Sequence, residues 1–392
     1  MKVAISGAGV AGPAFAHWML RGGHDVTLIE TAPRFRTGGY VIDFWGLGYR
    51  IAQKMGIEKE VREAGYQVQK LRSVDGKGRA AASLTVEPIR EVTGGLYTSV
   101  ARGDLAAAIY RTVENDIETI YSDSITAIED KTDCLAVTFE NSAPREFDMV
   151  VGADGLHSNV RNLVFGPESS FEHYLGCQVA ACVLDGYRPR DELTYVTHNL
   201  PGRQIGRFAL DGDRTLVLFI FRSPTPEIPD TPELYKKLLR DQFGNGDWEC
   251  AQILDALDDV DDLYFDVVSQ IRLERWTSGR VALIGDAAAC VSLLAGEGTG
   301  LAMVEAYVLA GELARANGNI SEACVAYDSL LHEFLEEKQR GATRFISFFA
   351  ARTNLGIWLR NQAMRAFNIG PVGRWVLTRT LRDDIELPEY DL

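Results

Sequence analysis

Short apolar runs and helical spacing alternate along the first thirty residues, and this order predicts one β–α–β unit. Residues 3–6 form an apolar run typical of a buried strand, and residues 13–21 carry helical spacing that two glycines end. Residues 26–29 form the next buried strand. Strand, helix and strand in this order predict a parallel sheet with a helix packed on it.

The hydrophobic pattern changes in the middle of the chain and later returns. From about residue 174 to residue 268 it has a period of two and is divided by turns, which predicts an inserted antiparallel sheet. A buried strand at residues 281–284 then precedes a helix beginning near Gly298. Residues 321–378 show helical spacing, which favours a long helix packed on both preceding parts over a helix lying on a membrane surface.

Three glycines with the spacing G-x-G-x-x-G separate the first strand from its helix, namely Gly7, Gly9 and Gly12. Glu30 ends the second strand, 18 positions after Gly12. Glycines let the backbone approach a pyrophosphate, the helix N-terminus offers free N–H groups, and a terminal carboxylate accepts the ribose hydroxyls. Because a carboxylate repels a 2′-phosphate, the sequence predicts FAD or NAD here rather than NADP. A purely structural glycine turn is the alternative, and the acid in register argues against it.

Composition narrows the class of protein. With 392 residues, 46% of them hydrophobic, the chain can form two or three domains. A net charge of −15 and a pI near 5.0 oppose nucleic acid or anionic membrane as the main partner, although local basic patches remain compatible. The six cysteines contain no C-x-x-C pair and the six histidines no metal-ligand spacing, so we expect a cytoplasmic protein without disulfides or metal. We also expect no stable membrane insertion, since no apolar run is long enough.

Polar residues follow a second apolar run, at residues 147–151. Asp154 and Gly155 come directly after it, where open α/β sheets place ligands, and Arg161 lies in the next helix. Asp154 and Arg161 could form an internal ion pair or could support a loop between two bound nucleotides, and the sequence leaves both open. Arg102, just before another helix, could hold a phosphate or could be a solvated surface arginine.

A third group follows the strand at residues 281–284. Gly285 and Asp286 end this strand, and an aspartate there could accept from ribityl or ribose hydroxyls. Gly296 and Gly298 allow backbone N–H groups to face a ring at a helix N-terminus. The alternative is a helix-capping aspartate beside a flexible glycine loop.

Together, the segments GAGVAG with Glu30, VGADGLHSNVR and LIGDAAACVSLLAGEG resemble the class A flavoprotein monooxygenases of the p-hydroxybenzoate hydroxylase fold. The resemblance spans nearly the whole chain, and a finer likeness is to the tetracycline-inactivating monooxygenases and their unassigned relatives. It implies an α/β fold with a Rossmann-like FAD-binding domain, an inserted antiparallel β-sheet domain for substrate, and a C-terminal helical part. The boundaries expected are residues 1–173 and 269–320 for the FAD-binding domain, 174–268 for the substrate-binding domain, and 321–392 for the C-terminal bridging helices.

The resemblance also assigns expected roles to residues. The glycine turn and Glu30 would hold the adenosine and pyrophosphate of FAD, Arg102 would hold FAD, and Asp286 would bind on the ribityl side. The motif containing Asp154 and Arg161 is linked in the family to FAD and NAD(P)H. The cofactor-binding residues expected are Gly7, Gly9, Val10, Ala11, Gly12, Glu30, Arg102, Asp154, Gly155, Arg161, Gly285, Asp286, Gly296, Gly298 and Thr299. No catalytic acid or base is identified.

The chain departs from the family pattern in one loop. Many members have a histidine where this sequence has Ala289, and a pair of prolines where it has Ser292 and Leu293. An asparagine common in the family is replaced by Gly300. These changes leave the FAD residues in place but alter the loop beside the reacting edge of the flavin, so we expect them to affect substrate choice and hydroxylation efficiency.

The function implied is that of an FAD-dependent monooxygenase, an oxidoreductase that uses NADPH, or NADH, and O2. Its expected substrate is an electron-rich phenolic, enolic or polycyclic small molecule, such as a tetracycline-like ring system, in a pocket walled by residues 194–210 and 292–295. The chain would be a monomer or a homodimer. Two alternatives are a flavin-dependent reductase or dehydrogenase that inserts no oxygen, and a non-catalytic flavoprotein that sequesters a ligand.

Overall fold

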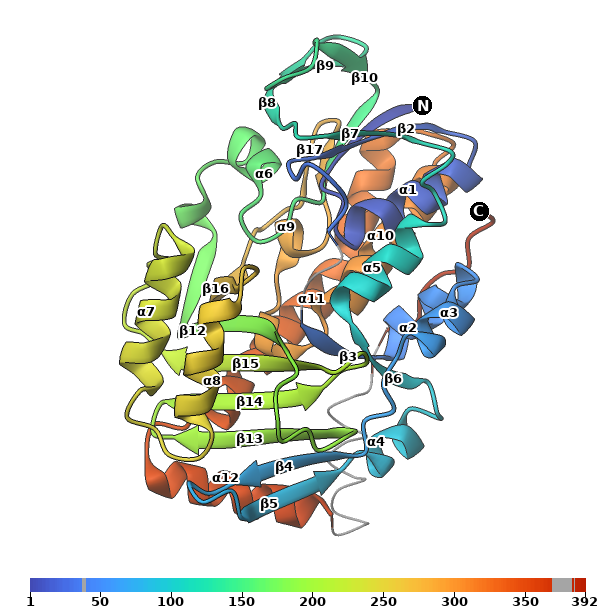
Figure 1. Ribbon diagram of the computed structural model, residues 1–392. Coiled ribbons are helices and arrows are strands. Elements are labelled where there is room, and N and C mark those ends of the chain that lie inside the picture. The colour runs from blue at the N-terminus through green and yellow to red at the C-terminus, as the bar shows by residue number, and fades with distance from the viewer. Residues whose placement is uncertain (37–39, 369–382, 384) are drawn as a thin grey trace.

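The computed structural model describes residues 1–36, 40–368, 383 and 385–392. Two sheets dominate it, and Figure 1 shows them at opposite ends of the molecule, with long helices running between them. The expected α/β class, with a Rossmann-like part, an antiparallel sheet and a helical C-terminal part, is confirmed.

The first sheet has six strands in the order β17–β18–β11–β1–β2–β7. Its strands are β1 (Lys2–Ser6), β2 (Asp25–Glu30), β7 (Glu118–Tyr121), β11 (Met149–Gly152), β17 (Thr277–Ser278) and β18 (Val281–Leu283). All neighbouring strands pair in parallel except the edge strand β17. Such a sheet is covered on both faces, so its central strands are apolar runs rather than alternating patterns. The predicted β–α–β unit is confirmed, and its helix α1 (Ala11–Arg21) begins two residues earlier than expected.

The second sheet has seven strands in the order β16–β12–β15–β14–β13–β4–β5. Its strands are β4 (Lys70–Val74), β5 (Ala80–Thr85), β12 (Glu172–Asp185), β13 (Thr194–Leu200), β14 (Arg203–Ala209), β15 (Arg214–Arg222) and β16 (Tyr264–Ile271). The predicted antiparallel strands of the insertion are confirmed. Their period of two is explained because the sheet buries different residues on its two faces.

The larger sheet includes strands from outside the expected insertion, while the domain boundaries themselves stay a prediction. Residues 70–85 were assigned to the FAD-binding part, but they form the hairpin β4–β5, and β4 pairs in parallel with β13 from Thr194↔Lys70 to His198↔Val74. The sheet also extends past residue 268, because β16 ends at Ile271. A local pattern identifies a hairpin, but the edge that a hairpin joins depends on pairing with residues far away in the sequence.

Shorter elements connect and cover the sheets. Two smaller sheets complete the strands: β3 (Val41–Trp45) pairs with β6 (Tyr97–Ala101), and β8 (Ile125–Asp130), β9 (Leu135–Phe139) and β10 (Arg145–Phe147) form a three-stranded sheet. The helices that precede β12 and follow α1 are α2 (Gly46–Lys54), α3 (Glu58–Glu63), α4 (Glu87–Val92), α5 (Arg102–Tyr110) and α6 (Asn159–Val164). The next four, after β15, are α7 (Pro232–Phe243), α8 (Cys250–Ala256), α9 (Asp286–Ala289) and α10 (Gly298–Arg315).

The two faces of the large sheet have different coverings. One face packs against α7 and α8, where Phe219 and Phe221 contact Phe243. The opposite face carries Phe208, which contacts Tyr66 from the segment before β4. This second face is directed toward β3, so it lies across from the part of the chain that carries the glycine turn (Figure 1).

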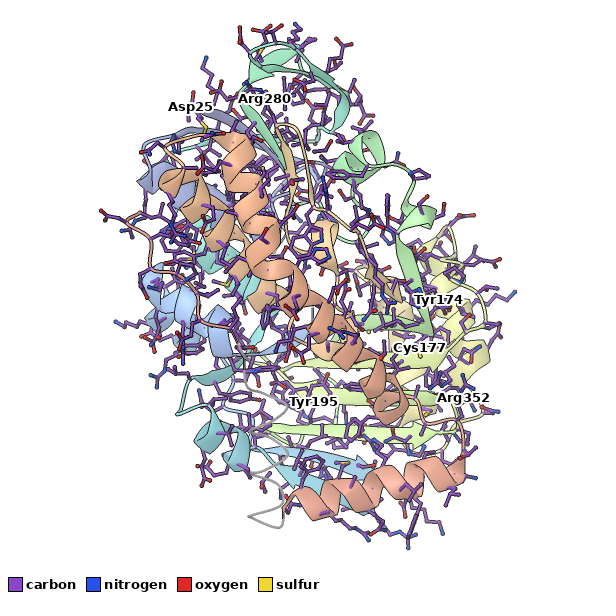
Figure 2. The ribbon with its side chains drawn as sticks, turned by 180° about the vertical axis from the view of Figure 1, so that it is seen from behind. Asp25, Tyr174, Cys177, Tyr195, Arg280 and Arg352 are labelled. Carbon is purple, nitrogen blue, oxygen red and sulfur yellow. The ribbon has the colours of Figure 1, made fainter. Side chains whose placement is uncertain are left out.

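Two helices form the C-terminal part, α11 (Ile320–Phe349) and α12 (Asn354–Phe367). The continuous helix expected over residues 321–378 is therefore interrupted, and its residues 369–378 lie outside the described residues. Thr353 is the N-cap of α12. Its side-chain oxygen accepts a hydrogen bond from Gly356 N at 3.1 Å, so the second helix begins directly after it. Seen from behind, α11 runs from the six-stranded sheet to the seven-stranded sheet, and α12 lies along the outer edge of the latter (Figure 2).

Nothing in the described segments suggests a membrane span or a metal site. No helix there is long and apolar enough to cross a bilayer. No three His, Cys, Asp or Glu side chains among the same residues converge on a common point.

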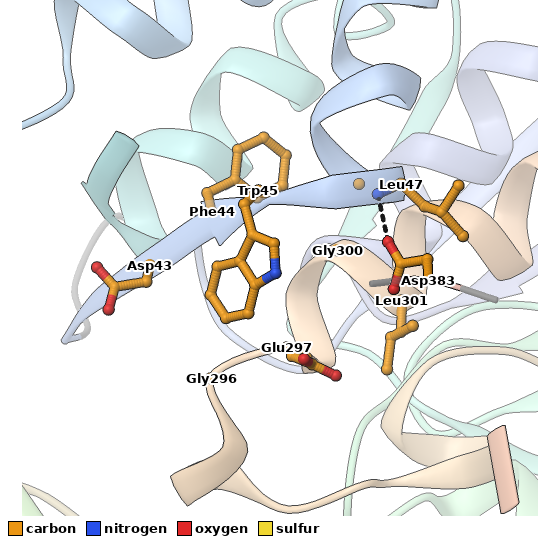
Figure 3. A pocket seen from close by; sticks show the side chains of 10 residues that line it. Asp43, Phe44, Trp45, Leu47, Gly296, Glu297, Gly300, Leu301 and Asp383 are labelled. Atoms are coloured by element: carbon orange, nitrogen blue, oxygen red, sulfur yellow. Dashed lines mark hydrogen bonds between the residues drawn. The ribbon is translucent and has the colours of Figure 1, made fainter. Parts of the chain in front are cut away.

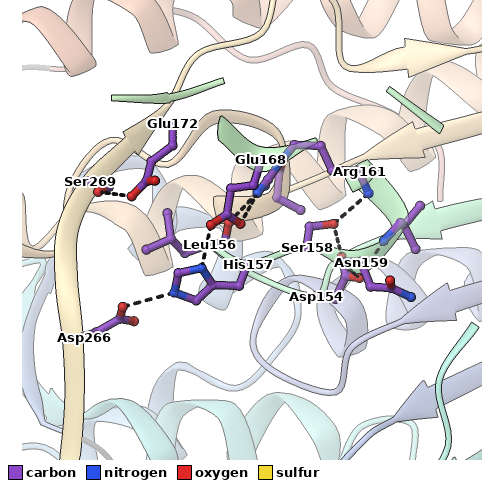
Figure 4. A network of polar contacts seen from close by, with 12 residues as sticks. Asp154, Leu156, His157, Ser158, Asn159, Arg161, Glu168, Glu172, Asp266 and Ser269 are labelled. Atoms are coloured by element: carbon purple, nitrogen blue, oxygen red, sulfur yellow. Dashed lines mark hydrogen bonds and ion pairs between the residues drawn. The ribbon is translucent and has the colours of Figure 1, made fainter. Parts of the chain in front are cut away.

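A polar cluster ties the loop between β11 and α6 to the large sheet (Figure 4). His157 Nδ1 lies 2.9 Å from Glu168 Oε1, and its Nε2 lies 3.2 Å from Asp266 Oδ1 on β16. The hydrogen bond with Asp266 and then the one with Glu168 raise the pKa of His157 from 6.5 to about 10. The protonated ring donates from both nitrogens, so the clamp joins the two parts of the molecule only while His157 is charged.

We expect the clamp to stabilise the fold in a pH-dependent way. Because the pKa is higher in the folded state, the contribution is fully present below about pH 6.5 and is lost as pH rises toward about pH 10. His157→Gln should therefore lower the melting temperature more at about pH 6 than at about pH 10.5. Thermal unfolding across this range measures the effect, and the exposed His173→Gln is the control. A melting-temperature loss that does not change with pH would contradict the assignment.

Candidate functional site

The glycine turn packs tightly against the end of β11. Gly7 has a φ of +107°, and a Cβ placed there would lie 2.4 Å from the Ala153 carbonyl oxygen. A Cβ on Gly12 would lie 2.0 Å from the Gly7 carbonyl oxygen. Only glycine fits at these two positions. Val10 is the N-cap of α1 and supplies no side-chain acceptor, so the start of α1 can offer its backbone N–H groups to an anion.

Glu30 reaches back to this turn from the end of β2. Its Oε2 accepts from Ala8 N at 2.9 Å, and its Oε1 accepts from Ala32 N at 2.8 Å and from Arg36 Nη2 at 3.2 Å. Burial would raise the pKa of Glu30, but the hydrogen bonds from Ala32, Ala8 and Arg36 outweigh it and lower the pKa overall. The carboxylate is therefore ionised beside the glycines, where it could accept ribose hydroxyls.

Arg102 was expected just before a helix. It is instead the first residue of α5. Its backbone N donates to the Tyr40 carbonyl oxygen at 2.9 Å, and its Nη2 lies 3.9 Å from the position of a Cβ on Gly9. Burial alone would lower the pKa of the guanidinium, and the facing Tyr40 and Asp286 groups raise it overall. Arg102 is therefore not a solvated surface arginine, because it lies between the glycine turn and Asp286.

Asp286 is the first residue of α9. Burial raises its pKa, and Arg102 opposes that rise. Its Oδ1 lies 3.4 Å from the position of a Cβ on Gly298, the first residue of α10. Thr299 follows in the same first turn, whose N-cap Glu297 makes no side-chain cap bond. The structure thus brings Glu30, Gly9, Arg102, Asp286 and Gly298 into one continuous line.

Two buried side chains hold the turn before Asp286, and neither is among the residues predicted from the sequence. Gly285, at a φ of +65°, donates its N–H to Glu305 Oε2 at 2.7 Å. The Tyr327 hydroxyl donates to the same oxygen at 3.2 Å. Burial raises the pKa of Glu305 well above its ordinary value. A glutamate within the otherwise apolar segment LAMVEAYVLAG was the available signal.

Asp154 and Arg161 are close to the turn but make separate contacts (Figure 4). Asp154 accepts from Asn159 N at 2.9 Å and from Val160 N at 3.0 Å, so it caps α6. Arg161 is fully buried and forms its ion pair with Glu168, at 2.8 Å, rather than with Asp154.

These two residues connect neighbouring parts of the site. Arg161 Nη1 donates to the Ala287 carbonyl oxygen at 3.1 Å and so links α6 to α9. A Cβ on Gly7 would lie 2.9 Å from Asp154 Cα, and Gly155 has a φ of +82° with open space beside it. Asp154 and Arg161 thus hold the loop beside the glycine turn without the ion pair between them that one interpretation expected, and the loop's role toward nucleotides stays a prediction.

The loop that lacks the family's prolines is held by other means. Ser292 is buried at a φ of +156°, and its Oγ accepts from Leu294 N at 3.3 Å. Proline fixes φ near −65° and cannot replace Ser292 here without moving the loop. Leu294, in the short 3₁₀ turn η3 (Leu293–Ala295), is buried against Val179 and Ile220 of the large sheet. Packing on the sheet thus takes the place of the prolines.

A small pocket opens between β3 and the start of α10 (Figure 3). Trp45, Gly296 and Gly300 line it, and Asp383 closes one side by accepting from Leu47 N at 2.9 Å. Gly296 has a φ of +72°, which places the loop at the rim of the pocket. The predicted glycines therefore border an opening next to the helix N-terminus.

Aromatic side chains line the face of the large sheet that is directed toward this region. Tyr195 stacks on Phe208 with ring centroids 5.6 Å apart, and Tyr66 meets the same ring edge-on at 5.4 Å. Tyr264 contacts Tyr40, with centroids 5.9 Å apart. Tyr195 and Phe208 lie in the segment expected to wall a pocket, whereas the sequence did not single out Tyr66 or Tyr264.

Asp43 faces this aromatic cluster from β3. Its Oδ1 accepts from the Tyr97 hydroxyl and from Ser99 Oγ, both at 2.6 Å. Burial and then Asp43 raise the pKa of Tyr195 above its ordinary value. The carboxylate, two tyrosines and a serine form a polar rim on an otherwise aromatic surface.

Arg360 of α12 adds a buried cation on the same face of the sheet. Its Nη1 donates to Ser73 Oγ at 3.2 Å, and its guanidinium lies 4.6 Å from the ring centroid of Phe348. Asn199 Nδ2 also donates to Ser73, and Asn199 shares a face of β13 with Tyr195. Burial lowers the pKa of Arg360 to about 10, and within the described chain no carboxylate pairs with it.

Comparisons with known proteins also indicate an FAD-binding protein. Residues 1–345 match the model of the family described as FAD binding domain. A flavin-dependent monooxygenase of Legionella longbeachae serogroup 1 (strain NSW150) is 32% identical over 402 residues, covering 100% of this chain and 98% of that protein. The crystal structure of tetracycline destructase Tet(55) superposes with a TM-score of 0.84 at 30% identity, over 99% of this chain and 98% of that one. That of tetracycline destructase Tet(51) has a TM-score of 0.81 at 29% identity, over 99% of both chains.

These matches confirm the resemblance that the three sequence motifs predicted. The family model covers more than half of the chain and includes the glycine turn, Glu30, Arg102 and Asp286. The chain belongs to the FAD-binding domain family and is a flavin-dependent monooxygenase.

Proposed function

We propose that FAD is held along the line of contacts from Glu30 to Gly298, and that the enzyme uses NADPH and O2 to oxygenate an electron-rich polycyclic phenol or enol. The observation that carries this proposal is the aromatic face of the large sheet, which lies across from the cofactor residues. When bound, FAD supplies hydride acceptance and O2 activation, and the protein supplies position and electrostatics.

Charges along the line fit the successive parts of the cofactor. Ionised Glu30 would accept the ribose hydroxyls, while Arg102 and the N–H groups of Val10 and Ala11 would hold the pyrophosphate. Asp286 would accept from the ribityl hydroxyls. Arg102 would then have negative groups on two sides, which offsets the cost of burying its charge.

The start of α10 suits the ring system. Gly298 and Thr299 are its first two residues, so their N–H groups have no partner within the helix. Donors at a helix N-terminus stabilise negative charge that develops nearby, and this arrangement would favour the reduced ring. The small neighbouring opening lined by Trp45 and Gly296 adjoins this terminus.

The substrate class follows from the walls of the facing sheet. Tyr195, Phe208 and Tyr66 offer ring faces and edges for stacking on a conjugated system. Arg360 offers a buried cation for an ionised phenol or enol oxygen. Similarity to the two tetracycline destructases supports a fused-ring substrate.

Exclusion of water is the remaining task of the site. Leu294 and its neighbours in η3 pack against Cys177 and Val179, so the loop beside the ring is continuous with the apolar core of the sheet. A dry enclosure suppresses side reactions that release reduced oxygen. A fused-ring substrate between the aromatic wall and the loop would complete this enclosure.

The proposed reaction is tested by following NADPH loss, O2 uptake, peroxide yield and product mass with a panel of tetracycline-like and simpler phenols. We expect a fused-ring enol to accelerate NADPH loss and to gain one oxygen atom, with less peroxide than the enzyme alone produces. A reduced product without added oxygen would favour the reductase alternative. Full FAD content without NADPH consumption would favour ligand sequestration.

Removing the charge of Glu30 should weaken the cofactor site. Hydrogen bonds to a charged acceptor contribute about 1.5–3 kcal/mol each, so Glu30→Gln should weaken FAD binding by about tenfold or more. Titration of FAD into apoprotein, followed by flavin fluorescence, measures the change. Glu118→Gln is the matched control, because Glu118 lies on the neighbouring strand β7 and pairs with Arg145 at the surface. Equal affinities in the two variants would contradict the role of Glu30.

Removing the charge of Arg360 should affect substrate rather than cofactor. Arg360→Met keeps an apolar stem and deletes an unpaired buried cation, so folding should not suffer. We expect KM for an enol or phenol substrate to rise by about tenfold, with FAD absorbance unchanged. Arg365→Met on the exposed side of the same helix is the control. A normal KM in the Arg360 variant would remove Arg360 from the substrate site.

A further inference from the structure

Charge is unevenly distributed along the chain, and α12 lies in its most basic part. Residues 338–368 contain six lysines and arginines and no aspartate or glutamate, and the absence of acids continues in the sequence to residue 382. The whole chain has a net charge of −15, so the residues outside 338–368 together carry −21. A basic segment in an acidic protein favours binding of an anionic partner at that segment.

The outward face of α12 is apolar. Leu355, Trp358 and Leu359 are 66%, 55% and 54% exposed, and their spacing places them on one turn of the helix. Among the residues that the structure describes, the other exposed large apolar side chains are Leu163, Leu234 and Val325, which lie on three different helices. Single exposed apolar residues are ordinary, but three together mark an interaction surface.

The inward face of α12 is already occupied. Met364 is buried, and Arg360 contacts Ser73 and Phe348. The helix lies along the outer edge of the molecule, beside β5 (Figures 1 and 2). Among the residues that the structure describes, none covers the exposed apolar turn.

Exposed cations flank this apolar turn. Arg352 lies just before α12, at its outer end in Figure 2, and Arg365 lies in its last turn. Arg365 Nη2 donates to the Ala81 carbonyl oxygen at 2.6 Å, and its side chain stays exposed. Tryptophan and leucine with arginines on either side are the groups that an interfacial helix places at a bilayer surface.

We propose that α12 docks reversibly on an anionic lipid bilayer. Leu355, Trp358 and Leu359 enter the boundary between headgroups and acyl chains, and Arg352 and Arg365 contact the anionic headgroups. The residues outside 338–368 carry a net charge of −21, so an anionic bilayer would repel them and favour the orientation in which α12 meets the membrane. A long polyanion such as nucleic acid would extend past α12 and be repelled by that remainder. Insertion of only three side chains makes the association weak and reversible. It does not require a membrane-spanning helix.

The experiment uses the full-length flavoprotein and vesicle flotation. We expect it to float with vesicles of mixed phosphatidylglycerol and phosphatidylcholine and not with phosphatidylcholine alone, and to be released as salt is raised. Trp358→Ser should reduce the bound fraction by about tenfold, and Arg352→Gln/Arg365→Gln should abolish the preference for anionic vesicles. Leu234→Ser, an exposed leucine on α7, is the matched control. Flavin absorbance and circular dichroism verify that each variant folds.

Each other outcome overturns the proposal. Equal binding to neutral and anionic vesicles removes the role of charge, and wild-type binding by Trp358→Ser removes the role of α12. A dimer that these substitutions convert to monomer, without vesicle binding, assigns the surface to a second copy of the chain. Stronger binding to duplex DNA than to vesicles assigns it to nucleic acid. None of these results depends on the substrate or on the reaction proposed above.

Discussion

The half-buried guanidinium of Arg102 is the group on which the rest of the site depends. A cation withdrawn from water is stabilised by negative groups nearby, and Tyr40, Asp286 and Tyr264 raise the pKa of Arg102 in this way. These partners come from α9, from the segment before β3 and from β16. Because β16 belongs to the large sheet, this one cation lies within electrostatic range of groups from the loop before α10 and from the facing sheet.

A second buried group, Glu305, explains how Asp286 keeps its place opposite Arg102. Glu305 accepts from Gly285 N and from the Tyr327 hydroxyl, so two long helices fix the turn from which Asp286 projects. Burial raises the pKa values of both carboxyl groups, and Arg102 opposes the rise for Asp286.

Features that depend on residues close together in the sequence could be predicted, and features that depend on distant residues could not. The glycine turn, Glu30 and the strand before Asp286 were readable because their signals lie within a few residues of one another. The attachment of β4 and β5 to the large sheet was not, because it depends on pairing between residues more than a hundred positions apart. Arg360 was missed for the same reason, since its contact Ser73 is distant in sequence. Glu305 carried a local signal, a single acid in an apolar helix, but its partners again came from elsewhere.

The polarity of the large sheet changes along β13, and this gradient bears on the proposed substrate. Tyr195 lies at the aromatic end, whereas Asn199, four residues later on the same face, joins Ser73 and Arg360 at the polar end. Four residues of strand span about 13 Å, which is longer than a single phenol ring. A small benzoate would reach either the aromatic wall or the cation, but not both. A fused-ring molecule with an ionised oxygen at one end would contact both at once, placing its conjugated rings toward the cofactor residues.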